Sequence, residues 1–458
     1  MGEAGQRGRL FGTDGVRGVA GHDLTVGLAM DLGVAAAAVL GRAAAGTPNG
    51  SPNAVAVIGR DPRASGPFLE AAVVAGLASA GVDVRLLGVV PTPGVAYLTK
   101  SLGADFGVVI SASHNPARDN GIKFFGPGGV KLPDATEDEI EATLGHGVPG
   151  ASTVFGRVTE ASAEQERYVD HLLATLPSGP RPPLAGWRVV VDCAHGAAYR
   201  VAPRALRRAG AEVITVGAEP DGLNINEDCG STCLEALAAA VVEHGADAGM
   251  AYDGDADRCL AVDADGQPLD GDQILTVLAT ELKESGRLAR DAVVVTVMSN
   301  LGFHVAMREA GIEVIETPVG DKHVSAAMRD GGYTLGGEQS GHIILLEHAT
   351  TGDGVLTSLQ LLAAVHRHGV SMTAAAGMMR KYPQVLLNVP GDAARLGPRV
   401  AAAVSLAESQ LGGNGRVLVR PSGTEPAIRL MVQAYDAHLA EWVIGQLADE
   451  VRLALNGQ

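Results

Sequence analysis

The chain has 458 residues, of which 46% are hydrophobic and only 3% aromatic, and its formal net charge is −17 at pH 7. This length exceeds what one hydrophobic core supports, so we expect about three or four domains. The acidic balance excludes a nucleic-acid backbone as the main partner, because neutralising phosphates requires a basic surface. Any phosphorylated ligand must therefore meet a local cluster of Arg, Lys and backbone N–H groups.

Neither a membrane span nor a zinc site is predicted. The sequence has no apolar signal core and no run of about eighteen apolar residues, so we expect a cytoplasmic protein without a membrane partner. Only one pair of cysteines is close together, with C-x-x-x-C spacing and no partner pair, which favours reduced thiols over zinc ligands. The cysteines are Cys193, Cys229, Cys233 and Cys259.

The N-terminal third alternates strand and helix patterns. Helices are predicted at 24–40 and 68–80, and strands at 54–58, 82–90 and 106–110. This alternation predicts parallel strands whose carboxyl ends carry ligand loops on one side. Before it, the segment RLFGTDGVRGVAG (9–21) brackets Arg17 with glycines, so that the arginine can approach an anion closely. An N-terminal hairpin or turn is the alternative interpretation of that segment.

The loop SASHNP (111–116) follows the apolar strand at 106–110. A serine beside an imidazole and a turn-forming Asn-Pro is suggestive of a nucleophile, although a hydroxyl needs activation by a base, metal or adjacent charge. A capping or turn sequence is the alternative. The loop GRDPRASG (59–66) is expected to face the same cleft. Lys123, in DNGIKFFGPGGVKL (119–132), is by count alone a surface residue, unless it faces that cleft too.

A second α/β unit follows linker-like sequence near 145–185, with strands predicted at 188–192, 212–216 and 246–252. The last strand leads into Asp253-Gly254-Asp255-Ala256-Asp257-Arg258, whose alternating carboxylates can converge if the backbone curls. An EF-hand is excluded, because position 6 is Arg258 instead of glycine and position 12 is Ala264 instead of an acid. A solvated acidic turn is the remaining alternative. Hard oxygen ligands suit Mg²⁺ or Ca²⁺, and Mg²⁺ is preferred because it usually combines a few carboxylates with a phosphate oxygen.

The third α/β unit has strands predicted at 292–297 and 312–317, followed by GGEQSGHI (336–343). There Glu338, Ser340 and His342 alternate, so an extended backbone would project all three side chains on one side. Carboxylate, hydroxyl and imidazole groups suit sugar hydroxyls. A polar set at a strand edge is the alternative.

From about residue 387 the pattern changes to a helix at 398–411 and two strands joined by PSGTEP. Strand, short loop, strand is typical of an antiparallel α+β module. Hydroxyls, a glycine and two guanidinium groups gather at this loop and are the components of a phosphate cradle. The cradle residues are Arg420, Ser422, Gly423, Thr424 and Arg429.

A serine loop, a D-G-D-x-D-R loop, a G-E-x-S-G-H type loop and a phosphate loop, in this order, resemble the α-D-phosphohexomutase superfamily over nearly the whole chain. The resemblance implies three similar α/β domains with mixed or parallel sheets, plus a smaller C-terminal α+β domain, around a central cleft. We expect the domains at 1–170, 171–272, 273–386 and 387–458. Six motifs are similar to the bacterial members that act on glucosamine phosphates: FGTDGVRG (11–18), ISASHNP (110–116), DNGIKFF (119–125), DCAHGAAY (192–199), LNINEDCGST (223–232) and GGEQSGHI (336–343).

This resemblance implies interconversion of glucosamine 6-phosphate and glucosamine 1-phosphate by a homodimeric enzyme that feeds UDP-N-acetylglucosamine and cell-wall synthesis. Ser113 would carry the phosphoryl group, with Ser111 as the fallback, and a hexose or hexosamine 1,6-bisphosphate would prime it. The implied metal ligands are a phosphoserine oxygen on Ser113 and the carboxylates of Asp253, Asp255 and Asp257. The implied supporting groups are Arg17 and Lys123 near the reacting oxygen, His114 at the phosphoserine, Arg258 beside its phosphate, Glu338, Ser340 and His342 at the sugar, and the cradle at the distant phosphate.

Three alternatives remain open at this point. Phosphomannomutase/phosphoglucomutase enzymes share the same machinery and differ in the sugar. A metal-dependent phosphatase would release inorganic phosphate, whereas a mutase would not. A non-catalytic sugar-phosphate sensor would keep the cradle but would need no phosphorylation of Ser113.

Overall fold

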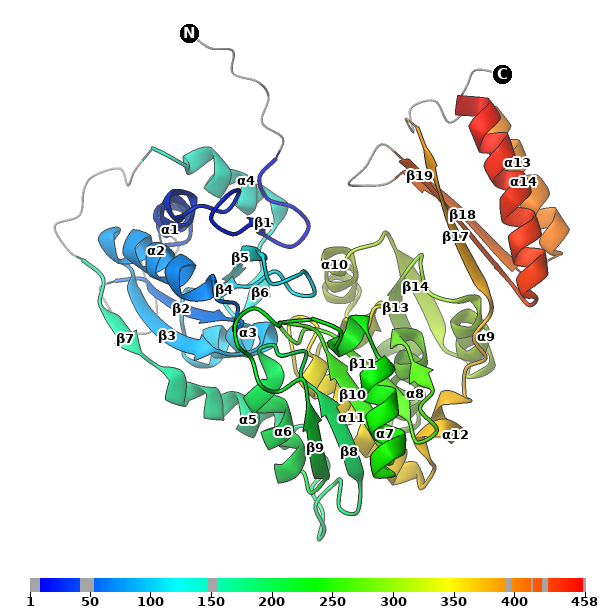
Figure 1. The fold of residues 1–458 in the computed structure, drawn as a ribbon, viewed down its shortest axis with the longest axis horizontal. Helices are drawn as coiled ribbons and strands as arrows, with labels where there is room; N and C mark the ends of the chain where they lie inside the picture. Colours follow the sequence, from blue (N-terminus) through cyan, green and yellow to red (C-terminus); the bar gives the residue numbers. More distant parts are fainter. Residues whose placement is uncertain are drawn as a thin grey trace. The chain divides into compact units, whose positions relative to one another are not determined.

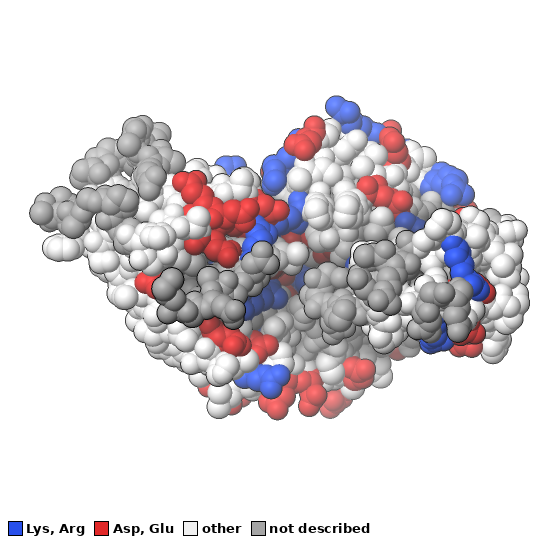
Figure 2. Space-filling view, turned by 90° about the horizontal axis from the view of Figure 1, so that it is seen from above, with Lys and Arg blue, Asp and Glu red and all other residues white. Residues whose placement is uncertain are grey.

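The computed structural model describes residues 9–41, 53–146, 155–391, 397–412, 415–421 and 427–455 (Figure 1). The chain divides into two compact units, one formed by residues 1–297 and 315–376 and the other by residues 298–314 and 377–458. Among the helices in the described ranges, none is long and apolar enough to cross a membrane. On the face drawn in Figure 2, the described Lys and Arg side chains lie among Asp and Glu side chains.

The first unit begins with a seven-stranded mixed sheet of order β1-β5-β4-β2-β3-β7, with β6 paired to β5. β2, β3 and β4 run parallel, as the alternating pattern predicts. β7, which was not predicted, runs parallel to β3, whereas β5 runs antiparallel to β4 and to β1. The strands are β1 (Val16–Val19), β2 (Val55–Arg60), β3 (Asp83–Val89), β4 (Phe106–Ile110), β5 (Asp119–Gly126), β6 (Val130–Lys131) and β7 (Val158–Glu160). The helices are α1 (Val26–Leu40), α2 (Gly66–Ser79), α3 (Thr92–Ser101) and α4 (Asp134–Thr143).

Two glycines allow α1 and α2 to pack closely against each other. A Cβ atom on Gly76 would lie 2.3 Å from the Met30 carbonyl oxygen, and one on Gly33 would lie 2.6 Å from the Val73 carbonyl oxygen. Both helices contribute apolar side chains, Leu32 among them, to a buried core shared with this sheet.

The second sheet has five strands in the order β12-β11-β10-β8-β9. β8, β9 and β10 are parallel, and β10 turns back into antiparallel β11 through residues 253–258. The elements are α5 (Gln165–Ala174), β8 (Arg188–Asp192), α6 (Ala198–Arg208), β9 (Glu212–Val216), the 3₁₀ turn η3 (Gly230–Thr232), α7 (Glu235–His244), β10 (Ala248–Tyr252), β11 (Cys259–Asp263) and β12 (Pro268–Leu269). Cys193, Cys229 and Cys259 are buried, and burial raises the pKa of each thiol.

The third sheet has the order β14-β13-β15-β16 and consists of β13 (Ala292–Thr296), β14 (Glu313–Thr317), β15 (Leu335–Gly337) and β16 (Ile343–Leu345). The helices before, between and after these strands include α8 (Gly271–Glu284), α10 (Asp321–Gly331), α11 (Gly354–His368) and α12 (Met372–Ala376). Residues 338–342 form a tight turn between antiparallel β15 and β16, in which Gly341 has φ 91. The expectation of an extended backbone here is wrong.

The second unit contains a three-stranded antiparallel sheet of order β17-β19-β18. Its elements are α9 (Leu301–Glu309), β17 (Gln384–Pro390), α13 (Pro398–Leu411), β18 (Gly415–Pro421), β19 (Ala427–Ala434) and α14 (Ala437–Leu455). Apolar side chains of α13 and α14, such as Val400 and Val443, pack with Leu430 of β19 into one core. The predicted strand, loop, strand arrangement is confirmed, and Ser422, Gly423 and Thr424 of its loop lie outside the described residues.

Candidate active site

The serine loop lies at the carboxyl end of β4, where the parallel arrangement predicts a ligand loop. Ser113 is buried, and its hydroxyl donates a hydrogen bond of 2.5 Å to Oδ2 of Asp253. The Ser113 Oγ also lies 3.5 Å from His114 Nδ1. Ser111 instead donates its hydroxyl to the buried carboxylate of Asp61. The structure therefore brings Ser113, and not Ser111, to the acidic loop.

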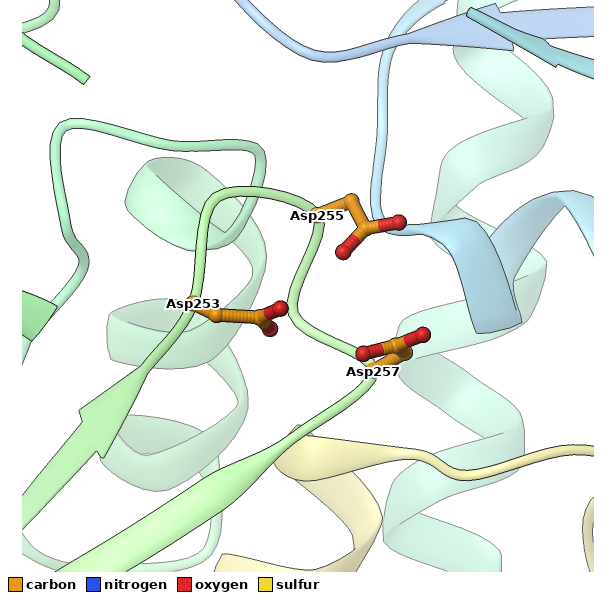
Figure 3. Close-up of side chains that lie close together, drawn as sticks. All are labelled: Asp253, Asp255 and Asp257. Carbon is orange, nitrogen blue, oxygen red and sulfur yellow. The ribbon is translucent and has the colours of Figure 1, made fainter. Parts of the chain in front are cut away.

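Asp253, Asp255 and Asp257 are buried in the turn between β10 and β11 (Figure 3). Ala256, between two of them, has φ 57 and curls the backbone so that all three side chains converge. Each residue offers an oxygen, and these oxygens lie within 4.8 Å of one another. Burial and the charges of Asp257 and Asp255 together raise the pKa of Asp253 far above its ordinary value.

Two carboxylate oxygens of this cluster are suited to bind a cation. Oδ1 of Asp255 and Oδ1 of Asp257 are buried, and neither has a hydrogen-bond partner among the described residues. Burial opposes ionisation of Asp257, but the charges of His342, Lys123 and Arg258 outweigh burial and hold its pKa below the ordinary range. Carboxylate oxygens without a hydrogen-bond partner are ligands that Mg²⁺ prefers, so the residues present fit a divalent cation.

Lys123 lies in β5 and is only 4% exposed, so the interpretation as a surface residue is wrong. Strand β5 lies between β1 and β4, which explains why the strand and its lysine are buried. The Lys123 Nζ atom lies 2.8 Å from Oδ2 of Asp255 and 2.7 Å from Oδ2 of Asp14. Burial favours the neutral amine, but these two carboxylates outweigh burial and raise the pKa of Lys123. Lys123 therefore remains a cation.

A chain of alternating charges continues from Asp14 around the site. Lys131 Nζ lies 3.1 Å from Oδ1 of Asp14 and also pairs with Asp321. The Asp321 Oδ2 atom lies 3.6 Å from His342 Nε2, and His342 Nδ1 lies 3.6 Å from Oδ2 of Asp257. Sequence reasoning missed Asp14, Lys131 and Asp321 as site residues. Asp14 could have been predicted from the sequence, because this residue belongs to the same glycine-rich motif as Arg17.

The remaining predicted groups lie around this chain. Arg17 pairs with Asp14, and its buried Nε atom has no hydrogen-bond partner in the described part of the chain. Arg258 donates its backbone N–H to Oδ1 of Asp253 at 3.3 Å. His114 is half-buried, and burial together with the charges of Arg258 and Arg17 lowers its pKa.

The turn between β15 and β16 does not project its three polar side chains alike. His342 is buried, and its Nε2 lies 3.0 Å from the backbone nitrogen of Gly352. Glu338 is half-buried and accepts a hydrogen bond of 3.2 Å from the Gly320 N–H, whereas Ser340 is exposed.

In the second unit, Arg420 and Arg429 face each other in register across β18 and β19. Both line a cavity of about 310 Å³ together with Met298, Leu386, Asn388, Leu418, Leu430 and Met431. The Nε atom of Arg429 is buried, without a hydrogen-bond partner in the described ranges. Burial and the charge of Arg429 lower the pKa of Arg420. Like charges directly opposite on a sheet are destabilising, so this pair fits an anion.

Four domain families match the chain in order. They are described as phosphoglucomutase/phosphomannomutase, alpha/beta/alpha domain I at residues 8–147, domain II at 166–266, domain III at 270–382 and the C-terminal domain at 387–450. The chain therefore belongs to the class of the phosphohexose mutases.

The phosphoglucosamine mutase of Thermobifida fusca (strain YX) is 62% identical over 448 residues, which are 97% of this chain and 98% of that protein. The phosphoglucosamine mutase of Streptomyces griseus subsp. griseus is 59% identical and covers 98% of this chain and 100% of its own length. The chain belongs to the phosphoglucosamine mutase family within the phosphoglucomutase/phosphomannomutase proteins.

Solved structures agree on the fold. A phosphoglucomutase/phosphomannomutase family protein from Burkholderia thailandensis superposes with a TM-score of 0.80 at 25% identity over 97% of each chain. The Aspergillus fumigatus N-acetylphosphoglucosamine mutase in complex with GlcNAc-6P and magnesium has a TM-score of 0.62 at 20% identity, over 80% of this chain and 92% of that chain.

Proposed function

We propose that this protein interconverts glucosamine 6-phosphate and glucosamine 1-phosphate through a phosphoserine and a hexosamine 1,6-bisphosphate. The observation that carries the proposal is the buried Ser113 hydroxyl, 2.5 Å from Asp253 in a cluster of three carboxylates. The family membership supports the substrate, since the full-length relatives are named for it.

In the proposed reaction, the free hydroxyl oxygen of the sugar attacks the phosphorus on Ser113. The bond from phosphorus to Ser113 Oγ breaks, the hydroxyl proton passes to a base, and a bisphosphate forms. The bisphosphate turns around, and its other phosphoryl group returns to Ser113, which leaves the isomeric monophosphate. This sequence moves no net phosphate, which distinguishes a mutase from a phosphatase.

The work of the chain in this reaction is to position groups and to compensate charge. Asp253, Asp255 and Asp257, with a phosphoserine oxygen, would hold Mg²⁺, which supplies compensation for negative charge on the phosphoryl group. Lys123 cannot take a proton while two carboxylates hold it as a cation, so it would stabilise charge instead of serving as the base. Arg258 would accompany the serine phosphate.

The other predicted roles remain part of the proposal. Arg17 and His114 would approach the reacting oxygen and the phosphoserine, and Glu338, Ser340 and His342 would contact the sugar. Arg420 and Arg429, with Ser422, Gly423 and Thr424, would hold the phosphate that is not reacting. The priming bisphosphate, the homodimer, the four domain boundaries and the cytoplasmic location stay predictions.

Intact-mass measurement and a coupled assay test this function together. The purified protein should carry the mass of one phosphate, and Ser113→Ala should lose both that mass and mutase activity. Ser111→Ala, as the matched control, should keep the phosphate. Full activity of Ser113→Ala would overturn the phosphoserine mechanism.

Substrate choice is tested by comparing glucosamine, N-acetylglucosamine, glucose and mannose phosphates. A preference for mannose or glucose phosphates would favour the phosphomannomutase/phosphoglucomutase alternative. Stoichiometric release of inorganic phosphate from these substrates would identify a phosphatase.

A further inference from the structure

The backbone of Ser113 has an unfavourable conformation that needs support from outside the loop. Its φ is 52, in the left-handed region that residues with a Cβ atom avoid. Such conformations persist where surrounding structure fixes them, and they occur at functional sites. Two side chains hold the Ser113 carbonyl oxygen: Arg63 donates to it through Nη2 at 2.9 Å, and Asn226 donates to it through Nδ2 at 2.9 Å.

The same two side chains also hold the next turn of the loop. The Asn115 carbonyl oxygen accepts from Arg63 Nη2 at 2.8 Å and from Asn226 Nδ2 at 3.1 Å. Arg63 is fully buried, and its other guanidinium nitrogens donate to the carbonyl oxygens of Pro116 and Asp119 and to Asp61. Arg63 comes from the 59–66 loop, so two strands of the same sheet supply the nucleophile and its first anchor.

Asn226 comes from a different sheet and reaches the serine loop beside the metal loop. Its segment connects β9 to η3, and its own φ is 60, which asparagine tolerates better than most residues. The backbone N–H of Asn226 donates to the Ala194 carbonyl oxygen at 2.9 Å, which fixes it to the second sheet. A Cβ atom on Gly254 would lie 2.4 Å from the Ser113 carbonyl oxygen and 3.0 Å from Asn226 Nδ2. Asn226 therefore lies where the serine loop meets the loop of three aspartates.

Phosphorylation makes this anchoring necessary. A phosphoserine carries about −1.5 to −2 charges at neutral pH, and here it would face three carboxylates. Repulsion would push the loop outward whenever a cation does not fully compensate these charges. Arg63 and Asn226 bind backbone carbonyl oxygens and do not bind the Ser113 hydroxyl, so they can hold the loop equally with and without the phosphoryl group.

We propose that Asn226, acting together with Arg63, is a positioning residue that keeps the Ser113 Oγ aligned with the aspartate loop through every phosphorylation state. This inference rests on the proposed role of Ser113 as phosphoryl carrier. It gives Asn226, and no other residue of the LNIN segment (223–226), a role in the reaction without contact to the sugar or the metal.

Two variants separate the amide group from the backbone conformation. Asn226→Gly removes the amide and tolerates a φ of 60 without strain. Asn226→Asp keeps the shape, but its carboxylate cannot donate to the two carbonyl oxygens. The matched control is Asn224→Ala in the same segment, whose side chain bonds only to Glu219 and Asp221 among the described residues. Melting curves are recorded first, to show which variants are folded. Asn226→Asp is expected to fold, because Asp is nearly isosteric with Asn and residue 226 is a half-buried loop residue.

The measurement is the single-turnover rate of phosphoryl transfer per phosphoserine, after loading with glucose 1,6-bisphosphate and counting phosphoserine by intact mass. Both Asn226 variants should slow this rate by about 10- to 100-fold with little change in KM, because misplacing a reacting group by about 1 Å has effects of this size. Asn224→Ala should match the wild type. A merely structural role would lower the loaded fraction and leave the rate per phosphoserine unchanged.

Wild-type rates per phosphoserine in folded Asn226→Gly and Asn226→Asp would overturn the inference, while an inactive Ser113→Ala would leave the proposed function standing. Activity of Ser113→Ala would instead overturn the proposed function itself. If Asn226→Gly does not fold, Asn226→Asp alone decides, since it keeps the size of the amide and replaces its N–H donors by a negatively charged oxygen.

Discussion

Replacing Asp253 by Asn is predicted to stabilise the metal-free protein while abolishing its response to Mg²⁺. The wild-type side chain lies with Asp255 and Asp257 in a buried cluster whose oxygens are within 4.8 Å of one another. With an effective dielectric constant of about 20, two unit charges at that separation repel by about 3.5 kcal/mol. Burial and these repulsions raise the pKa of Asp253 far above its ordinary value, so at neutral pH the metal-free wild type must either keep the repulsion or take up a proton there. The substitution removes that cost.

Nearby cations offset part of this repulsion in the wild type, since Lys123 contacts Asp255 and Arg258 lies 3.8 Å from Asp257. We therefore expect a net gain of about 1–3 kcal/mol in the free energy of unfolding of the metal-free protein. In a chain of this size that gain corresponds to a rise of about 1 °C in melting temperature per kcal/mol. Bound Mg²⁺ should stabilise the wild type, because a ligand that binds only the folded state shifts the folding equilibrium.

Melting curves with chelator and with added Mg²⁺ test this reasoning. The wild type should melt at a higher temperature with Mg²⁺ than with chelator. Metal-free Asp253→Asn should melt at a higher temperature than the metal-free wild type, should not respond to Mg²⁺, and should have lost mutase activity. Asp265→Asn removes the same charge from an exposed position outside the cluster and should behave like the wild type. The reasoning is refuted if metal-free Asp253→Asn melts below the metal-free wild type while still responding to Mg²⁺.

Three further predictions concern other parts of the molecule. Arg429→Gln removes one of two like charges that face each other across β18 and β19, so KM for the phosphosugar should rise about 10- to 100-fold while thermal stability holds or improves; an unchanged KM would count against the phosphate cradle. Asp353 is buried at the N-terminus of α11, and burial raises its pKa from 3.8 to about 6. Because the folded-state pKa is the higher one, the protonated form stabilises the fold below about pH 4 and this contribution, about 3 kcal/mol, is lost as the pH rises through about 6. Asp353→Asn should remove that loss in unfolding measurements across this range, and parallel pH curves for the two proteins would contradict the assignment. Gly76→Ala would place a Cβ atom 2.3 Å from the Met30 carbonyl oxygen, so chemical denaturation should show a loss of about 1–3 kcal/mol, and an unchanged midpoint would disprove the close packing of α1 on α2.

The sequence predicted the parts of the site that are local in the chain. Strand β4 matches the predicted range 106–110, and both the serine loop and the aspartate loop follow buried strands as expected. These segments could be predicted because a short apolar run followed by polar residues is a pattern of neighbouring positions alone.

Other features depend on contacts between distant positions and could not be predicted. Lys123 pairs with Asp255, 132 residues away, and only the pairing of β5 between β1 and β4 makes its burial understandable. Lys131 meets Asp321 across 190 residues. The turn at 338–342 was misread because alternation of polar residues also occurs in a hairpin turn, where Gly341 supplies the positive φ.

The alternating chain from Asp255 through Lys123, Asp14, Lys131, Asp321 and His342 to Asp257 has a consequence for the speed of the chemistry. In water, solvent dipoles must reorient each time negative charge moves from one oxygen to another. Here the compensating dipoles are already fixed in direction by their own partners, so little reorientation accompanies phosphoryl transfer. Most of the reorganisation energy is therefore supplied once, during folding. Each turnover then starts in an environment that is already polarised for the negative charge that develops during the reaction.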